Sequence, residues 1–368
     1  MLRKFANILL TFLSLFVLEL ISQVIILKFE NKFSIIFNPL ANNIFRLKSI
    51  NEQLVNYQLS WDFKNNKMKP GVYMHKDIKY NINSKGFRGK EFEIEKKKIR
   101  IAVFGGSTTI GLESPEDKTY PYQLEQFLNK SSDSHEVINM GFSSKSLRFI
   151  KSLFFNEVYI YKPDFIIIYN NRNSIMYDGS SVEHSFENAK ILRVHYFLLD
   201  NIMTYRLIKK IYNKIYNFNI NTNYLKSPFH NKGISKEYLL NGYKNSLIEI
   251  IKFANEKKIK VVLVKEAYNF NSNIIEEVNI FSIDDLIEKY EKNFFIQKYN
   301  LDETSNFWIV LGAILNKKLD ELTNFDNVIV VDPIKKLLKS KDNFTDYIHL
   351  TPRGNEILAK EIYNSIIN

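Results

Sequence analysis

The sequence predicts a doubly wound α/β fold with a mostly parallel five-stranded sheet flanked by helices. Short, largely apolar runs lack the alternation of half-exposed strands, which is typical of parallel strands buried on both faces. Stretches with helical spacing of apolar residues separate these runs, and this order of elements favours a parallel sheet. The expected strands are Ile99–Phe104, Val137–Met140, Phe165–Tyr169, Val261–Val264 and Val328–Val331.

Apolar side chains recur at helical spacing between and after the expected strands. We assign these stripes to core packing and not to cofactor contacts. The stripes are Tyr120/Leu124/Phe127/Leu128, Leu147/Ile150/Phe154/Val158, Tyr243/Leu247/Ile250/Ala254, a looser Leu311/Leu315/Leu322, and a closing Ile357/Leu358/Ile362.

Outside the regular pattern, two further regions are recognisable. Residues 28–97 have few periodic signals and are interpreted as a connecting and packing region ahead of the main domain, residues 98–368. Between about residues 178 and 236 the alternation of strands and helices fails. This stretch is too long for an ordinary loop, so it is interpreted as an inserted cap or binding element.

The N-terminal residues resemble a membrane anchor. Residues 5–27 are largely apolar and about long enough to span a bilayer, although Glu19 and Gln23 interrupt them. A cleaved signal peptide is the alternative, but no convincing small-x-small cleavage site follows. The basic residues within 1–4 favour a cytoplasmic N-terminus. We therefore expect a single-pass protein of the cell membrane whose working domain is extracytoplasmic, in the periplasm or on the outer face.

Composition narrows the function classes. The formal net charge is +11, but no run of five basic residues occurs, which indicates a solvated lysine-rich surface and disfavours nucleic acid as a partner. There is no cysteine, which excludes disulfides and thiolate catalysis. The six histidines lack metal-ligand spacing, so neither a metal nor a cofactor is expected.

A glycine-rich turn follows the first expected strand, with the sequence Gly105-Gly106-Ser107-Thr108. Two glycines allow a sharp strand-to-helix turn that exposes Ser107 near backbone N–H groups, as a nucleophile needs. Such a turn can also cradle phosphate, although the Walker lysine is missing, or can be purely structural.

Polar residues also follow later strands. Gly141 follows the second strand, where a glycine can bring its backbone N–H close to a ligand. Three asparagines, Asn170, Asn171 and Asn173, follow the third, and their amides can donate to an oxyanion or cap a turn. After the last strand come Asp346 and His349, with the spacing of a carboxylate that orients a general base.

These motifs, in this order, resemble the sequence blocks of the SGNH hydrolases, also called GDSL-like esterases and lipases. The resemblance runs from about residue 83 to the end, apart from the insert, and the Asn83–Gly89 approach is similar to that of membrane-anchored members. It implies a flavodoxin-like sheet. It also implies that Ser107 is the nucleophile, His349 the base and Asp346 its orienting acid.

For the oxyanion hole, the resemblance implies the backbone N–H groups of Ser107 and Gly141 and the side-chain amide of Asn173. Two departures stand out. Gly106 replaces the usual aspartate before the serine, and the third block reads Asn171-Arg172-Asn173-Ser174 where Gly-x-Asn-Asp is usual. Arg172 brings positive charge towards the site, and Asn170 or Asn171 are alternative donors.

The leading interpretation is a membrane-anchored serine esterase or deacetylase that hydrolyses an O-ester, on an acylated glycan, another cell-surface ester or a small ester. An O-acyltransferase that modifies a surface polysaccharide uses the same acyl-serine, so it remains open. A catalytically inactive glycan-binding scaffold is the non-enzymatic alternative. The sequence favours no oligomeric state.

Overall fold

The computed structural model describes residues 10–11, 13–22, 61–62, 67–75, 77–177, 204–205, 208 and 238–367. The chain divides into two compact units. The smaller comprises Met1–Lys69, Tyr73–His75 and His184–Ile220, and the larger comprises Pro70–Val72, Lys76–Glu183 and Asn221–Asn368.

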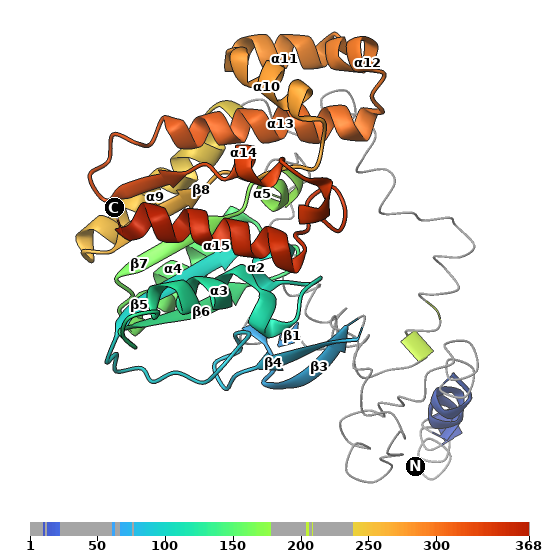
Figure 1. The fold of residues 1–368 in the computed structure, drawn as a ribbon. Coiled ribbons are helices and arrows are strands. Elements are labelled where there is room, and N and C mark those ends of the chain that lie inside the picture. Colours follow the sequence, from blue (N-terminus) through green and yellow to red (C-terminus); the bar gives the residue numbers. More distant parts are fainter. Residues whose placement is uncertain are drawn as a thin grey trace. The chain divides into compact units, whose positions relative to one another are not determined.

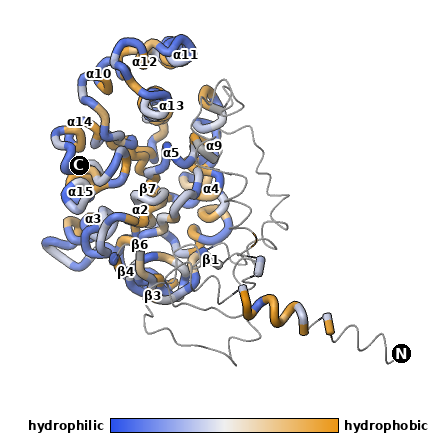
Figure 2. Tube along the Cα trace, turned by 90° about the vertical axis from the view of Figure 1, so that its right-hand side faces the viewer, coloured by the Kyte–Doolittle hydropathy of each residue, from blue (hydrophilic) through white to orange (hydrophobic). Residues whose placement is uncertain are grey.

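In the smaller unit, the described residues between 10 and 22 are helical and mostly apolar (Figure 2). Glu19, which interrupts the apolar pattern of the sequence, accepts hydrogen bonds from the backbone N–H (2.9 Å) and the hydroxyl (2.7 Å) of Thr204. Strands β1 (Trp61–Asp62) and β2 (Lys67–Met68) form an antiparallel pair.

The expected membrane span, residues 5–27, lies partly outside the described residues. Within the part of the chain that the structure describes, no helix is both long enough and apolar enough to cross a bilayer. Of the expected insert at 178–236, the structure describes only residues 204, 205 and 208.

The larger unit contains the predicted five-stranded parallel sheet (Figure 1). Its order is β6-β5-β7-β8-β9, which is the flavodoxin-like order 2-1-3-4-5 when the strands are counted along the chain. The observed strands lie within two residues of the predicted bounds: β5 (Ile99–Gly105), β6 (His135–Gly141), β7 (Phe165–Tyr169), β8 (Lys260–Val264) and β9 (Val328–Val331).

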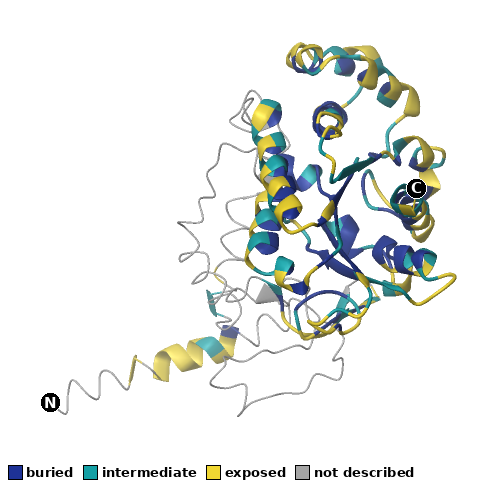
Figure 3. Cartoon of the chain, turned by 90° about the vertical axis from the view of Figure 1, so that its left-hand side faces the viewer, coloured by how far each residue is buried: buried dark blue, intermediate teal, exposed yellow. Residues whose placement is uncertain are grey.

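Helices cover both faces of the sheet, which leaves its strands buried between them (Figure 3). Ile101 and Val103 belong to the core cluster that α3 and α15 complete, whereas Phe104 packs edge-on against Phe154 of α4 at 6.0 Å. Burial on both faces explains the unbroken apolar runs in the sequence. The helices are α2 (Ser107–Ile110), α3 (Tyr120–Leu128), α4 (Leu147–Asn156), α5 (Arg172–Tyr177), α9 (Tyr243–Glu256), α14 (Ile334–Leu337) and α15 (Pro352–Ile367).

The connection between β8 and β9 contains more helices than the sequence analysis predicted. It contains α10 (Ser272–Ile280), α11 (Ile283–Glu291), α12 (Phe294–Tyr299) and α13 (Glu303–Asp320). Because α10 and α11 pack on α13, residues on most sides of α13 are buried, which explains its weak apolar stripe. The larger unit also contains β4 (Ile78–Ile82) and the single turns Glu116–Lys118, Val158–Tyr161, Tyr238–Gly242 and Lys341–Asn343, and β3 (Gly71–His75) has residues in both units.

The Asn83–Gly89 approach segment holds the turn that carries the expected nucleophile. Arg88 is 2% exposed, and its guanidinium donates to the carbonyl oxygens of Gly111 (2.7 Å) and Ser114 (3.0 Å), just beyond α2. The same guanidinium lies 4.0 Å from the ring centroid of Tyr80. A buried cation thus satisfies carbonyl groups at the end of a four-residue helix that has little stability of its own.

Replacing Arg88 with methionine should lower the free energy of unfolding by about 3 kcal/mol, because buried carbonyl groups would lose their charged donor. Urea denaturation of the full chain measures this change. Arg353→Met, which removes an exposed arginine from the start of α15, should leave it within about 0.5 kcal/mol. An equally small change for Arg88→Met would contradict the structural role given to Arg88.

Candidate active site

Ser107 stands at the junction between β5 and α2, and glycines make this junction possible. A Cβ on Gly105 would lie 2.5 Å from the carbonyl oxygen of Tyr169 and 1.9 Å from the Thr109 hydroxyl, so no side chain fits there. Gly106 precedes Ser107 as the N-cap of α2. Ser107 therefore lies beyond the carboxyl end of β5, where open parallel sheets bind ligands.

The structure brings together the three residues expected to form the catalytic group. The Ser107 hydroxyl lies 2.8 Å from Nε2 of His349, and Nδ1 of His349 lies 2.6 Å from Oδ2 of Asp346. Ser107 and His349 are 242 residues apart in sequence. Hydroxyl, imidazole and carboxylate thus form one continuous chain of hydrogen bonds, the arrangement that activates a serine.

Asp346 also builds the turn that presents His349. Its Oδ1 accepts the backbone N–H groups of Ile348 and His349, both at 2.8 Å, while Oδ2 contacts the imidazole. The backbone N–H of Thr345 donates to the carbonyl oxygen of His349 at 2.8 Å and closes the turn. One carboxylate therefore fixes both the backbone and the ring of the expected base.

Partial burial disfavours the charged form of Asp346, but hydrogen bonds from the His349 ring and from the N–H groups of His349 and Ile348 outweigh it. Together they lower the pKa of Asp346 from 3.8 to about 2. Asp346 is therefore ionised at neutral pH, which favours the proton on Nδ1 of His349. Nε2 is then left as an acceptor for the Ser107 hydroxyl.

Of the three expected asparagines, only Asn173 has an uncommitted side-chain amide. The structure gives that amide no hydrogen bond to the described residues, although Asn173 is buried. A Cβ built on Gly106 would lie 2.2 Å from Nδ2 of Asn173, so this amide packs directly on the backbone beside Ser107. The absence of a side chain on Gly106 thus makes room for the Asn173 amide.

Asn170 and Asn171, the alternative donors, are engaged in the scaffold. Asn170 donates to the carbonyl oxygen of Lys145 at 2.7 Å. Asn171 donates to Asn316 Oδ1 at 2.6 Å and accepts from the Tyr243 hydroxyl at 2.7 Å. Both amides are therefore occupied in holding the β7 loop against its neighbours.

The structure does not support the oxyanion role expected of Gly141. Its backbone N–H donates to Oδ1 of Asn139 at 3.0 Å and is already satisfied. A Cβ at this position would lie 2.4 Å from the backbone nitrogen of Ile110, so the glycine is required for close packing of α2 on β6. In the loop that follows, Ser144 has a φ of 60°, a conformation that is strained for a residue other than glycine.

Sequence reasoning missed Glu266, a fully buried acid just after β8. Its Oε2 accepts the backbone N–H of Arg172 at 2.6 Å and the Tyr268 hydroxyl at 2.9 Å. Burial raises the pKa of Glu266, and these hydrogen bonds and the positive charge of Arg172 only partly offset the effect. Glu266 anchors the start of α5 and thereby fixes the position of Asn173. The sequence signal for this role is an acid close behind the end of an apolar strand.

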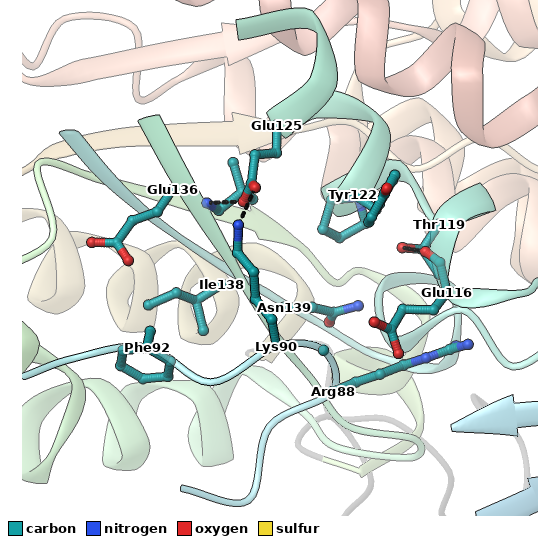
Figure 4. Close-up of a pocket in the computed structure, with 13 residues that line it drawn as sticks. Arg88, Lys90, Phe92, Glu116, Thr119, Tyr122, Glu125, Glu136, Ile138 and Asn139 are labelled. Carbon is teal, nitrogen blue, oxygen red and sulfur yellow. Dashed lines mark hydrogen bonds and ion pairs between the residues drawn. The ribbon is translucent and has the colours of Figure 1, made fainter. Parts of the chain in front are cut away.

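A separate pocket lies along β6, at the edge of the sheet, and contains none of the three expected catalytic residues (Figure 4). An ion pair between Lys90 and Glu125 lies within it. Residues from the approach segment, from the stretch just after it, from α3 and from β6 line the pocket, among them Arg88, Phe92, Tyr122, Glu136 and Asn139. Among the described residues, no cluster of three or more His, Asp or Glu side chains is arranged to hold a metal ion.

No family model and no curated protein matches the chain. Solved structures to which it is similar include the lipase/acylhydrolase from Enterococcus faecalis, with 16% identity, a TM-score of 0.41, and coverage of 73% of this chain and 94% of that one. Another is Axe2, an acetylxylan esterase from Geobacillus stearothermophilus, with 14% identity, a TM-score of 0.40, and coverage of 75% and 96%. Similarity at this level assigns no function to the chain. The roles of the site residues are therefore inferred from the geometry of the site.

The hydrogen bonds to Asp346 predict a pH-dependent contribution to stability. The pKa of this carboxyl in the folded chain, about 2, lies below the ordinary value of 3.8, so its ionised form is favoured by folding. The wild-type chain should therefore be more stable than Asp346→Asn above about pH 4, and this difference should vanish as the pH falls through about 2.

Chemical denaturation of both chains across this pH range measures the difference. Asp326→Asn, which removes an exposed carboxyl from a different loop, controls for the loss of one negative charge. A difference between wild type and Asp346→Asn that stays constant from neutral pH to pH 2 would show that the carboxylate does not hold this turn.

Proposed function

We propose that this protein is a serine hydrolase of the SGNH type that cleaves oxygen esters through an acyl-serine intermediate. The observation that carries the proposal is the chain of contacts from Ser107 through His349 to Asp346, at 2.8 and 2.6 Å. These contacts favour an enzyme over a glycan-binding scaffold, because ligand binding alone requires no aligned nucleophile, base and acid.

In the first half of the reaction, the Ser107 oxygen attacks the ester carbonyl while Nε2 of His349 takes the hydroxyl proton. The ionised Asp346 stabilises the resulting imidazolium. The tetrahedral intermediate then collapses, the bond to the alcohol oxygen breaks, and His349 returns the proton to the departing alcohol. In the second half, a water molecule gives a proton to His349 as its oxygen attacks the acyl carbon. The bond from the acyl carbon to the Ser107 oxygen then breaks, the acid leaves, and His349 returns the proton to Ser107.

The developing oxyanion needs preorganised donors near Ser107. Ser107 is the first residue of α2, where a backbone N–H has no acceptor within the helix. The Asn173 amide, packed on Gly106, is a second and neutral donor. Loss of one such donor typically lowers the rate about a hundredfold or more.

The proposed substrate is an acylated glycan or another cell-surface ester, and the proposed location is the cell membrane, with the hydrolase domain on the extracytoplasmic side. The apolar residues 5–27 and the basic residues before them support this location. The resemblance of the Asn83–Gly89 approach to that of membrane-anchored relatives also supports it.

A fluorophosphonate probe tests the nucleophile directly. In the full chain, Ser107 should displace fluoride from phosphorus and become covalently labelled, and Ser107→Ala should abolish labelling. His349→Ala should slow it by about a thousandfold or more, because the hydroxyl would lose its base. In-gel fluorescence and peptide mapping measure the label.

Ser132→Ala serves as the matched control, because Ser132 is exposed and precedes β6, at the opposite end of the strands from Ser107. It should be labelled at the wild-type rate. The proposed mechanism would be excluded if the folded wild-type chain took up no label, or if Ser107→Ala were labelled as strongly as the wild type.

A further inference from the structure

Arg172 lies between the expected oxyanion donor and an aromatic cluster. It is the first residue of α5 and precedes Asn173. Its guanidinium carbon lies 4.9 Å from the ring centroid of Trp308 and 5.1 Å from that of Tyr347. The two rings are stacked, with centroids 6.1 Å apart. Because Tyr347 belongs to the turn between Asp346 and His349, the cation is placed beside the triad.

The guanidinium has aromatic neighbours but no acceptor. Within the described residues, the structure gives it neither an ion pair nor a hydrogen bond, and its Nε is buried without a partner. Nε1 of Trp308, in a side chain that is 1% exposed, also lacks an acceptor. Two donors in one cluster are therefore unsatisfied, a costly arrangement for a role in packing alone.

The nearest acid does not fill this role. Glu266 accepts the backbone N–H of Arg172, but its carboxylate forms no ion pair with the guanidinium. Among the described residues, the guanidinium of Arg172 therefore has no acid bound to it directly.

We propose that the ester substrate is anionic and that the Arg172 guanidinium binds its carboxylate or phosphate group while Ser107 attacks the ester. This inference rests on the proposed function and names the class of substrate. A planar guanidinium binds either anion through two parallel hydrogen bonds. Contact with Trp308 and Tyr347 holds the plane of the guanidinium, so little side-chain freedom remains to be lost on binding.

A purely structural role for Arg172 makes a different prediction. If the cation only packed against Trp308 and Tyr347, its loss would displace α5 and Asn173 and would slow the hydrolysis of all esters alike. An anion-binding role requires the loss to depend on the charge of the substrate. Charge selectivity in turnover therefore separates the two roles.

The test uses the full chain and three acetyl esters that carry the acetyl group on the same sugar hydroxyl: a neutral methyl glucoside, the corresponding glucuronoside and a phosphorylated glucoside. The wild type should turn over at least one anionic ester with a kcat/KM about 10- to 100-fold above that of the neutral ester. The preferred anion identifies carboxylate or phosphate as the bound group.

Arg172→Met should abolish this preference, because its kcat/KM should fall about 10- to 100-fold further on the preferred anionic ester than on the neutral ester. Arg172→Lys should retain part of the preference, since a point charge replaces a planar fork. Arg353→Met, the matched loss of an exposed arginine, should keep all of it.

The anion-binding role would be overturned if the wild type turned over the three esters equally. It would also be overturned if Arg172→Met lowered the kcat/KM of all three esters by the same factor. In either case, hydrolysis of the neutral ester and labelling of Ser107 would still support the proposed function. Absence of both labelling and turnover would remove the proposed function, and the anion-binding role with it.

Discussion

The carboxylate of Asp346 is the interaction on which the site depends. It accepts two backbone N–H groups and one imidazole N–H, so the shape of the turn and the orientation of His349 have a single cause. Because these donors together outweigh the cost of burial, the carboxyl is ionised at neutral pH. That charge leaves Nε2 of His349 free to accept the proton of the Ser107 hydroxyl, 2.8 Å away.

Sheet topology turns distant sequence segments into neighbours. All five strands run parallel, so the loops after β5, β7 and β9 end at the same edge of the sheet. Ser107 follows β5, Asn173 follows the central strand β7, and Asp346 and His349 follow β9. Glu266, which follows β8, supports the same edge by accepting a hydrogen bond from the backbone N–H of Arg172. Glu266 is buried, so its role is to hold the backbone of the site in place.

The strands and the Ser107, Asp346 and His349 positions were predictable because their signals are local: apolar runs, a double glycine before serine, and an acid three residues before histidine. The choice among Asn170, Asn171 and Asn173 was not, since it depends on partners such as Asn316 and Tyr243 that are remote in sequence. The partner of the Gly141 N–H, the side chain of Asn139, was likewise not predictable from the local sequence. Helices α10, α11 and α12 lacked a long apolar stripe and were missed.

The central claim is that Ser107, His349 and Asp346 act as one group, with Asn173 facing the oxyanion. A crystal structure of the full chain after reaction with a fluorophosphonate tests this most directly, because the adduct mimics the tetrahedral intermediate. We expect phosphorus bonded to the Ser107 oxygen, the phosphoryl oxygen within hydrogen-bond distance of the Asn173 amide, and His349 still in contact with Asp346. An adduct on another residue, or a phosphoryl oxygen directed away from Asn173, would contradict it.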